Sequence, residues 1–363
     1  MKKILSTIAA TAMLSTSLWV APSFADGVSA GNEGSGDASR AAPGVEFSIE
    51  KAKPIAPPKI EGEVPRAAPM SEEQAIKSFT ARGISSDGKE VTVEPSEALR
   101  SIIKQELSGG SAGGDASKTS GPQAGVEDPA FEGERTVFGK DDRVEIKDTT
   151  QYPFRTIGII LMKSKSGAEG TCTGTLIGPR TVLTAAHCLY NHEDGGWLDE
   201  FLFVPGLKGA TANDAPFGAY YYETAYVVNG FIDNYQGFYG SVVPWDLGII
   251  TLKDPIGDHV GWMGYGHFDN LGTFTANIVG YPGDKPAGTM WRATCEVKGE
   301  NIANEYMQYQ CDTFPGSSGS SVYALDANKQ RVTVGVNVAE SPDANTAVRI
   351  NAGYLEWINS LNQ

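Results

Sequence analysis

The sequence predicts an all-β fold for residues 136–363. Three observations carry this prediction: short apolar or alternating runs such as 155–162 and 246–252, Gly, Pro, Asn and Asp between the runs, and a length sufficient for one large β domain or two small barrels. Short strands at this spacing are typical of sandwiches and barrels. One amphipathic helix is expected over 352–361, where the apolar side chains recur three residues apart at Leu355, Ile358 and Leu361.

The first 25 residues have the pattern of a signal peptide. Two lysines precede an apolar run over residues 4–20, and the small residues Ser23 and Ala25 fit a signal-peptidase site. An uncleaved membrane anchor is the alternative, but the run contains Ser and Thr and is shorter than the ~20 apolar residues of a spanning helix. We therefore expect cleavage near Ala25 and secretion to the extracellular space or the periplasm.

Residues 26–135 are rich in Gly, Ala, Ser, Pro and Glu and poor in aromatic residues. This composition buries too little apolar surface to offset the entropy of ordering, so we expect a largely disordered segment. Two stretches are exceptions, because Ser71 and Gln74 have the spacing of a helix-capping box and Ser96 can cap a second helix. Each helix can dock on a partner surface, first of all the chain's own C-terminal domain. A Gly/Ser-rich linker is expected over 108–126.

The net charge and the cysteines indicate which partners and which metal or disulfide chemistry the chain can have. A net charge of -15 argues against nucleic acid or a membrane surface as a partner, because both require a basic face. Four cysteines in an exported chain indicate two disulfides. A zinc site is the alternative, but no Cys-x-x-Cys is present, and the adjacent His187 and Cys188 are poorly placed for one tetrahedron. No metal or organic cofactor is expected.

Ser318, which lies between glycines in residues 314–321, is a candidate acylating nucleophile. A serine in such a setting is usually part of a flexible turn, so the motif needs support from a base. Acyl transfer requires a neutral base near the hydroxyl, a carboxylate that orients the base, and N–H donors for the oxyanion. His187 is the candidate base, since it follows a predicted strand whereas the other three histidines stand in polar or Gly-rich sequence. A purely structural histidine is the alternative; a Cys172–Cys188 bridge would tie its turn to the preceding strand.

Residues 172–177 and 183–188 resemble the first half of the site of chymotrypsin-like serine proteases. The resemblance implies two six-stranded antiparallel β-barrels, a site in the cleft between them, and the chain order His, Asp, Ser. Asp246 matches the orienting carboxylate, with a solvent-facing aspartate at a strand edge as the alternative. The resemblance thus assigns nucleophilic attack to Ser318 and proton transfer to His187.

Within that class, residues 136–363 are similar to the bacterial glutamyl endopeptidases. Several separated stretches carry the similarity, in the same order along the chain: 141–143, 177–182, 280–285, 287–291 and 312–313. The resemblance implies an oxyanion hole made by the backbone N–H groups of Gly316 and Ser318.

The same resemblance implies a zymogen whose propeptide, residues 26–135, is removed after Arg135. In the relatives the new terminal amine, here that of Thr136, helps to bind a substrate carboxylate. A threonine and a histidine assist it; Thr313 matches the first, but Asn337 stands in place of the second. Asparagine carries no positive charge, so a carboxylate loses its strongest contact, and an altered side-chain preference becomes an alternative to an acidic one.

The sequence therefore predicts a monomeric secreted serine endopeptidase that acts on proteins or peptides, with its own propeptide as an intramolecular partner. A second disulfide is expected between Cys295 and Cys311, tying a hairpin that leads into the nucleophile turn. The aromatic-rich segment 220–245 is expected to serve in packing, with lining of the substrate cleft as the alternative. Two rival functions are an inactive protease homologue that acts as a secreted binding module and an esterase-like hydrolase.

Overall fold

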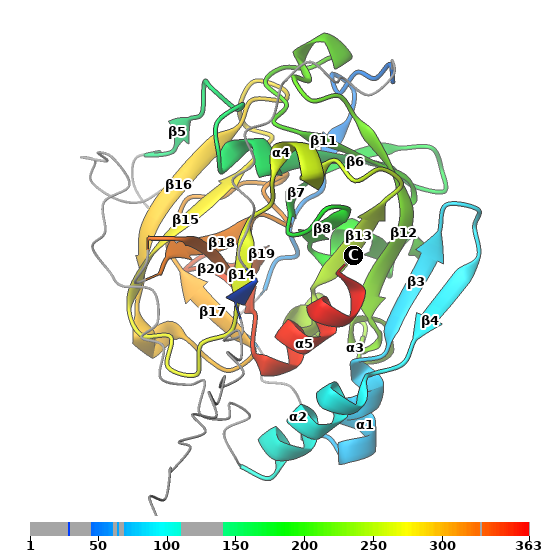
Figure 1. The fold of residues 1–363 in the computed structure, drawn as a ribbon, viewed down its shortest axis with the longest axis vertical. Helices are drawn as coiled ribbons and strands as arrows, with labels where there is room; N and C mark the ends of the chain where they lie inside the picture. The colour runs from blue at the N-terminus through cyan, green and yellow to red at the C-terminus, as the bar shows by residue number, and fades with distance from the viewer. Residues whose placement is uncertain are drawn as a thin grey trace, which may run out of the picture.

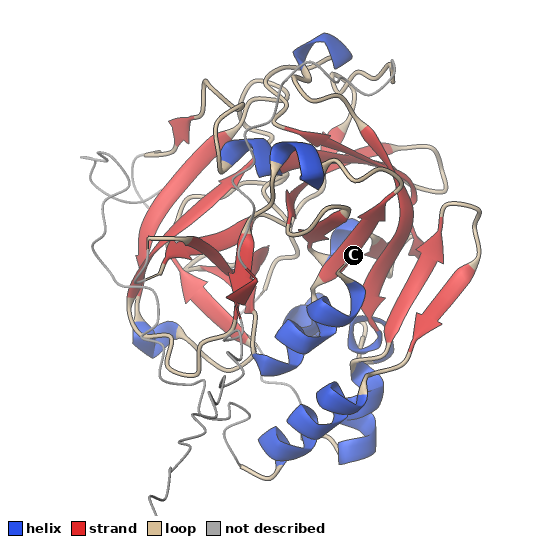
Figure 2. Ribbon diagram, viewed as in Figure 1, coloured by secondary structure: helices blue, strands red, loops and turns tan. Residues whose placement is uncertain are grey.

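The computed structural model describes residues 28–29, 45–60, 64, 69–109, 141–326 and 329–362. The expected signal peptide over residues 1–25, the expected cleavage site at Arg135 and the expected new terminus at Thr136 lie outside these described residues. Strands dominate the body of the molecule, and short helices lie at its edges (Figure 2). No helix among the described residues is long and apolar enough to cross a membrane.

The first β-barrel is a closed ring of six antiparallel strands. Strand β11 pairs with β6 on one side and with β12 on the other, and this double pairing closes the ring. Its interior is filled by buried aliphatic and aromatic side chains, among them Ile160, Leu183 and Ile250. The strands are β6 (Ile157–Lys163), β7 (Glu169–Leu176), β8 (Thr181–Thr184), β11 (Asp199–Pro205), β12 (Tyr220–Val228) and β13 (Gly248–Leu252).

The second β-barrel has six strands in the order β16-β15-β18-β19-β20-β17. Within the described residues no strand pairing joins β16 to β17, and the Cys295–Cys311 disulfide spans that side instead. The prediction of two six-stranded barrels is confirmed, although only the first is closed by hydrogen bonds. The strands are β15 (Phe274–Gly280), β16 (Trp291–Val297), β17 (Tyr306–Tyr309), β18 (Ser321–Leu325), β19 (Arg331–Glu340) and β20 (Asn345–Arg349).

The barrels lie side by side (Figure 1) and share an apolar contact. Ile157 and Val204 from the first barrel join Val279 and Tyr323 from the second in one buried cluster. Burial of this apolar surface holds the two barrels together. Short elements complete the domain: β5 (Val144–Glu145), β9 (Tyr190–Asn191), β10 (Gly196–Trp197), β14 (Gly264–Gly266), α3 (Asn229–Asp233), α4 (Gly257–Val260) and the predicted terminal helix α5 (Ala352–Leu361).

The N-terminal segment packs on the first barrel, as the cyan elements of Figure 1 show. Both predicted helices are present, with the capping box at Ser71 and Gln74 and the cap at Ser96. A hairpin between the helices pairs with β12 and extends the sheet, and β2 pairs with β7, so the expected disorder is wrong for residues 45–60 and 69–109. The elements are β1 (Val28–Ser29), β2 (Lys53–Pro54), α1 (Glu72–Ser78), β3 (Ala81–Ser85), β4 (Glu90–Val93) and α2 (Glu97–Leu107).

The second helix, α2, packs on α5. Leu99 and Ile103 are buried in the same apolar cluster as Trp357 of α5. At the start of α2 the Ser96 hydroxyl donates a hydrogen bond of 3.0 Å to Glu356. The chain's own C-terminal domain is therefore the surface that receives this helix.

Candidate active site

His187 and Asp246 are brought together by neighbouring strands of the first barrel. His187 lies in a 3-10 turn just after β8, and Asp246 lies just before β13. Strands β8 and β13 pair with each other, with Thr184 opposite Gly248, so the residues that flank this pairing meet at one end of the barrel. Two positions 59 residues apart in the chain thus become neighbours.

Asp246 makes two hydrogen bonds to His187, one to the imidazole and one to the backbone. One carboxylate oxygen lies 2.7 Å from His187 Nδ1, and the other accepts the His187 backbone N–H at 2.9 Å. Asp246 is fully buried and His187 is 6% exposed. Because a carboxylate accepts, Nδ1 carries the proton and Nε2 is left as the acceptor. This is the arrangement that a general base requires.

Tyr239 is a third member of this cluster that the sequence did not single out. Its hydroxyl donates a hydrogen bond to the same oxygen of Asp246 that binds His187 Nδ1. The Tyr239 ring also stands edge-on to the imidazole, with 5.9 Å between centroids. Burial, together with the nearby charge of Asp246, raises the pKa of Tyr239 well above its usual value, so the phenol remains a donor. The sequence placed this tyrosine in a run of packing aromatics, where no pattern distinguishes it from its neighbours.

Ser318 lies in a tight turn that requires glycine on both sides. Gly316 and Gly319 have φ values of 100° and 86°, in the region that side chains disfavour. A Cβ atom on Gly319 would lie 2.2 Å from the Thr173 carbonyl oxygen, so no other residue fits there. The turn is bonded to the first barrel, since the N–H of Thr173 donates to the Ser318 carbonyl at 2.8 Å and its hydroxyl to the Gly316 carbonyl at 2.8 Å.

The nucleophile turn adjoins the histidine turn. The Ser318 carbonyl oxygen lies 3.8 Å from Cys188 Sγ, one residue after His187. Both Ser318 Oγ and His187 Nε2 are buried, and neither has a hydrogen-bond partner among the described residues. A buried hydroxyl without a partner is costly, and such groups in native structures are often reserved for function.

Both predicted disulfides are confirmed. Cys172 on β7 is bonded to Cys188, which anchors the His187 turn to the strand that also holds the nucleophile turn. Cys295 is bonded to Cys311, shortly before the nucleophile turn.

The disulfides also decide whether the cysteines can bind a metal ion. Among the described residues, the grouped donors that could hold a metal ion are Cys172, His187 and Cys188, and two of these three are joined in a disulfide. Their sulfurs cannot act as thiolate ligands, so the donor set does not fit a metal site.

The residues expected to bind the substrate side chain are only partly brought together. Asn337 is buried, and both polar atoms of its side chain have a partner: its Oδ1 accepts from the Tyr309 hydroxyl at 2.7 Å, and its Nδ2 donates to the Ser317 carbonyl at 3.2 Å. Thr313 is half-buried, just before the nucleophile turn. Thr136 lies outside the described residues. Tyr309 is a further residue that sequence reasoning missed, because nothing in its local sequence ties it to Asn337.

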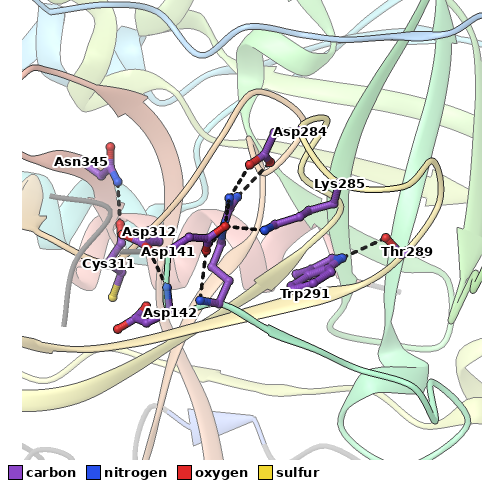
Figure 3. A network of polar contacts seen from close by, with 10 residues as sticks. Asp141, Asp142, Asp284, Lys285, Thr289, Trp291, Cys311, Asp312 and Asn345 are labelled. Carbon is purple, nitrogen blue, oxygen red and sulfur yellow. Dashed lines mark hydrogen bonds and ion pairs between the residues drawn. The ribbon is translucent and has the colours of Figure 1, made fainter. Parts of the chain in front are cut away.

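A network of ion pairs and hydrogen bonds connects the start of the domain to the segment before the nucleophile (Figure 3). The Arg143 side chain is 5% exposed and pairs with Asp141 and Asp284. Arg143 holds the pKa of the Asp141 carboxyl well below its usual range. The backbone N–H of Asp142 donates to Asp312 at 3.2 Å. Residues 141–143 are therefore fixed beside the segment that leads to the nucleophile turn.

The N–H of Gly316, which the sequence assigned to the oxyanion hole, has a partner. It donates to the carbonyl of Ile55 at 3.2 Å, from the N-terminal segment. This amide therefore donates out of the nucleophile turn, to the N-terminal segment.

Comparison with known proteins agrees with this fold. A family model described as Trypsin matches residues 144–358. The chain belongs to the trypsin family. It is 35% identical over 198 residues to a glutamyl endopeptidase of Bacillus licheniformis, a match that covers 54% of this chain and 57% of that protein. It is 30% identical over 218 residues to an extracellular metalloprotease of Bacillus subtilis, covering 59% of this chain and 66% of that protein. The matches therefore span less than two thirds of these curated relatives.

The likeness extends to a solved structure. A Glu endopeptidase in complex with MPD is 29% identical, with a TM-score of 0.52, and the match covers 61% of this chain and 97% of that one. Membership of the trypsin family and this likeness confirm the predicted chymotrypsin-like fold and the similarity to glutamyl endopeptidases.

Proposed function

We propose that the chain is a secreted serine endopeptidase made as a zymogen, with Ser318, His187 and Asp246 as its catalytic triad. The observation that carries the proposal is the double hydrogen bond between Asp246 and His187, which leaves a buried Nε2 acceptor beside the turn of Ser318. Membership of the trypsin family supports the same assignment. Substrates are proteins or peptides, and the working form is a monomer.

The reaction follows from the roles of these groups. Ser318 Oγ attacks the scissile carbonyl while its proton passes to His187 Nε2, and Asp246 stabilises the imidazolium that forms. The N–H groups of Gly316 and Ser318 stabilise the oxyanion. His187 then gives its proton to the leaving amine, which departs and leaves an acyl-enzyme. Water, deprotonated by the same Nε2, hydrolyses the ester and restores Ser318. No step requires a metal or an organic cofactor.

Side-chain preference in this proposal differs from that of a strict glutamyl endopeptidase. Asn337 is neutral, and its hydrogen bonds to Tyr309 and Ser317 are internal to the protein. A substrate carboxylate would thus bind to Thr313 and to the amine of Thr136, but it would lack the positively charged side chain that a histidine at position 337 can supply. We therefore propose a weakened preference for glutamate.

Maturation in this proposal has two parts. Removal of the signal peptide near Ala25 exports the chain, and cleavage after Arg135 exposes the amine of Thr136. The two disulfides suit an oxidising compartment outside the cell.

Labelling with a sulfonyl fluoride tests the nucleophile. The processed chain, cut after Arg135 as verified by N-terminal sequencing and then separated from its N-terminal fragment, is expected to take up one label and to hydrolyse peptide amides. Ser318→Ala is expected to abolish both, whereas the matched variant Ser317→Ala keeps them. Labelling that persists in Ser318→Ala would refute the assignment. A processed chain that neither takes up label nor cleaves peptides would favour the inactive binding module. A chain that hydrolyses esters but not peptides would favour the esterase.

A further inference from the structure

Residues 53–60 of the N-terminal segment cross from one barrel to the other beside the nucleophile turn. At one end β2 pairs in parallel with β7, with Pro54 opposite Thr171, and the Ile55 N–H donates to the Thr171 carbonyl at 2.9 Å. At the other end Lys59 forms a parallel bridge with Glu340 of β19. The segment therefore bonds to a strand edge of each barrel.

Between these two ends the segment touches the proposed oxyanion hole. The Ile55 carbonyl accepts the N–H of Gly316 at 3.2 Å. The Pro54 ring packs on two glycines, since a Cβ atom on Gly283 would lie 2.0 Å from Pro54 Cγ and one on Gly316 would lie 3.2 Å from Pro54 Cβ. The N–H that the mechanism needs for the substrate is thus already occupied.

Further contacts hold the far end of the segment. The Ile60 N–H donates to the Glu340 carbonyl at 3.0 Å, and the Glu340 N–H donates to the Pro58 carbonyl at 3.3 Å. Ile60 itself is 3% exposed and belongs to the main apolar cluster. Pro57 and Pro58 fix their own φ angles and offer no N–H, so the segment is stiff and loses little entropy when bound in an extended form.

We propose that residues 53–60 are a built-in inhibitor that fills the substrate cleft, with the Ile55 carbonyl in the oxyanion hole; this inference rests on the proposed function. Activation then requires two events: the cut after Arg135 and the departure of this segment. The cut alone does not release it, because β3 is paired with β12 and α2 is packed on α5.

A substitution that creates a steric clash with Pro54 tests the proposal in the full-length chain. Gly283→Ala places a methyl group where the Pro54 ring lies, at a position outside the triad. Loss of the two Ile55 hydrogen bonds is expected to raise hydrolysis of a small chromogenic peptide by the uncut chain roughly tenfold or more. Gly272→Ala, where an added Cβ meets nothing within 4 Å, is the matched control and is expected to change nothing. Adding Pro54→Gly to Gly283→Ala removes the clash and is expected to restore inhibition.

A peptide added in trans gives a second measurement that does not depend on the folding of Gly283→Ala. A synthetic peptide of residues 52–60 is expected to inhibit the processed chain competitively. The same peptide with Ile55→Pro lacks the N–H that Thr171 accepts and is expected to inhibit roughly fivefold less well.

The outcomes separate this inference from the proposed function. An uncut chain as active as the processed chain would overturn the inference and leave the peptidase assignment standing. Equal activities of uncut Gly283→Ala and Gly272→Ala, together with no inhibition by the peptide, would overturn it as well. A processed chain that shows no Ser318-dependent labelling and no peptide hydrolysis would overturn both.

Discussion

Docking of α2 on the C-terminal domain is expected to weaken as the pH rises, because of one partly buried carboxyl group. Glu106 lies in the last turn of α2, and its pKa is raised from 4.5 to about 7, mainly by burial and then by the nearby Glu305, with a smaller effect of Asp269; Arg349 opposes the change. The docked form of Glu106 therefore binds a proton more tightly than the free helix does. Its contribution to docking is fully present below pH 4.5 and is lost as the pH rises through about 7.

The size of the effect follows from the two pKa values. The difference between 4.5 and about 7, at ~1.4 kcal/mol per pKa unit, corresponds to at most about 3 kcal/mol. The dissociation constant of the N-terminal segment from the domain is expected to rise by up to about two orders of magnitude between pH 4.5 and pH 8.

Fragment dissociation provides the assay. The chain is cut after Arg135, and release of the N-terminal fragment is followed by gel filtration or fluorescence at several pH values. Glu106→Gln, which mimics the protonated side chain, is expected to remove most of the pH dependence. Glu97→Gln is the matched control on the same helix, since the Glu97 side chain is 98% exposed. A pH dependence in Glu106→Gln equal to that of the wild type would refute the reasoning.

Two further predictions concern the site. Tyr239→Phe removes a donor to Asp246 and is expected to lower kcat of the processed enzyme about tenfold with little change in KM, measured with a chromogenic peptide; an unchanged kcat would contradict a positioning role. Asn337→His supplies a group that can carry positive charge and is expected to raise the share of cleavage after glutamate in a mixed peptide pool. Asn337→Gln, which stays neutral, is the control, and a wild-type enzyme already strict for glutamate would refute the pocket argument.

Local patterns in the sequence predicted local structure well. The caps at Ser71 and Ser96 depend on a few consecutive residues, and both form as expected. The hairpin between the two helices was not predicted. The composition averaged over residues 26–135 indicated disorder, although a short stretch around Asp87 and Gly88 alternates between apolar and polar residues. Gly88 has φ = 81°, as a tight turn between paired strands requires.

The long-range part of the site was only partly predictable. The His187–Asp246 pair followed from a resemblance; its hydrogen bonds depend on the pairing of β8 with β13, which the sequence does not specify. The roles of Tyr239 and Ile55 had no sequence signal at all. Each depends on where a distant segment comes to lie, and the Pro-rich sequence around Ile55 reads as a linker by composition alone.

The contacts of the nucleophile turn imply that the turn already has its active shape while residues 53–60 still cover it. The turn is held by Thr173 of the first barrel, whose N–H and hydroxyl bind the carbonyls of Ser318 and Gly316. Neither of these bonds involves residues 53–60, and the segment takes only the Gly316 N–H from the turn. Departure of the segment therefore frees an oriented donor without breaking any bond that shapes the turn. Since no refolding of the turn is needed, activity should appear at the rate at which residues 53–60 leave the cleft.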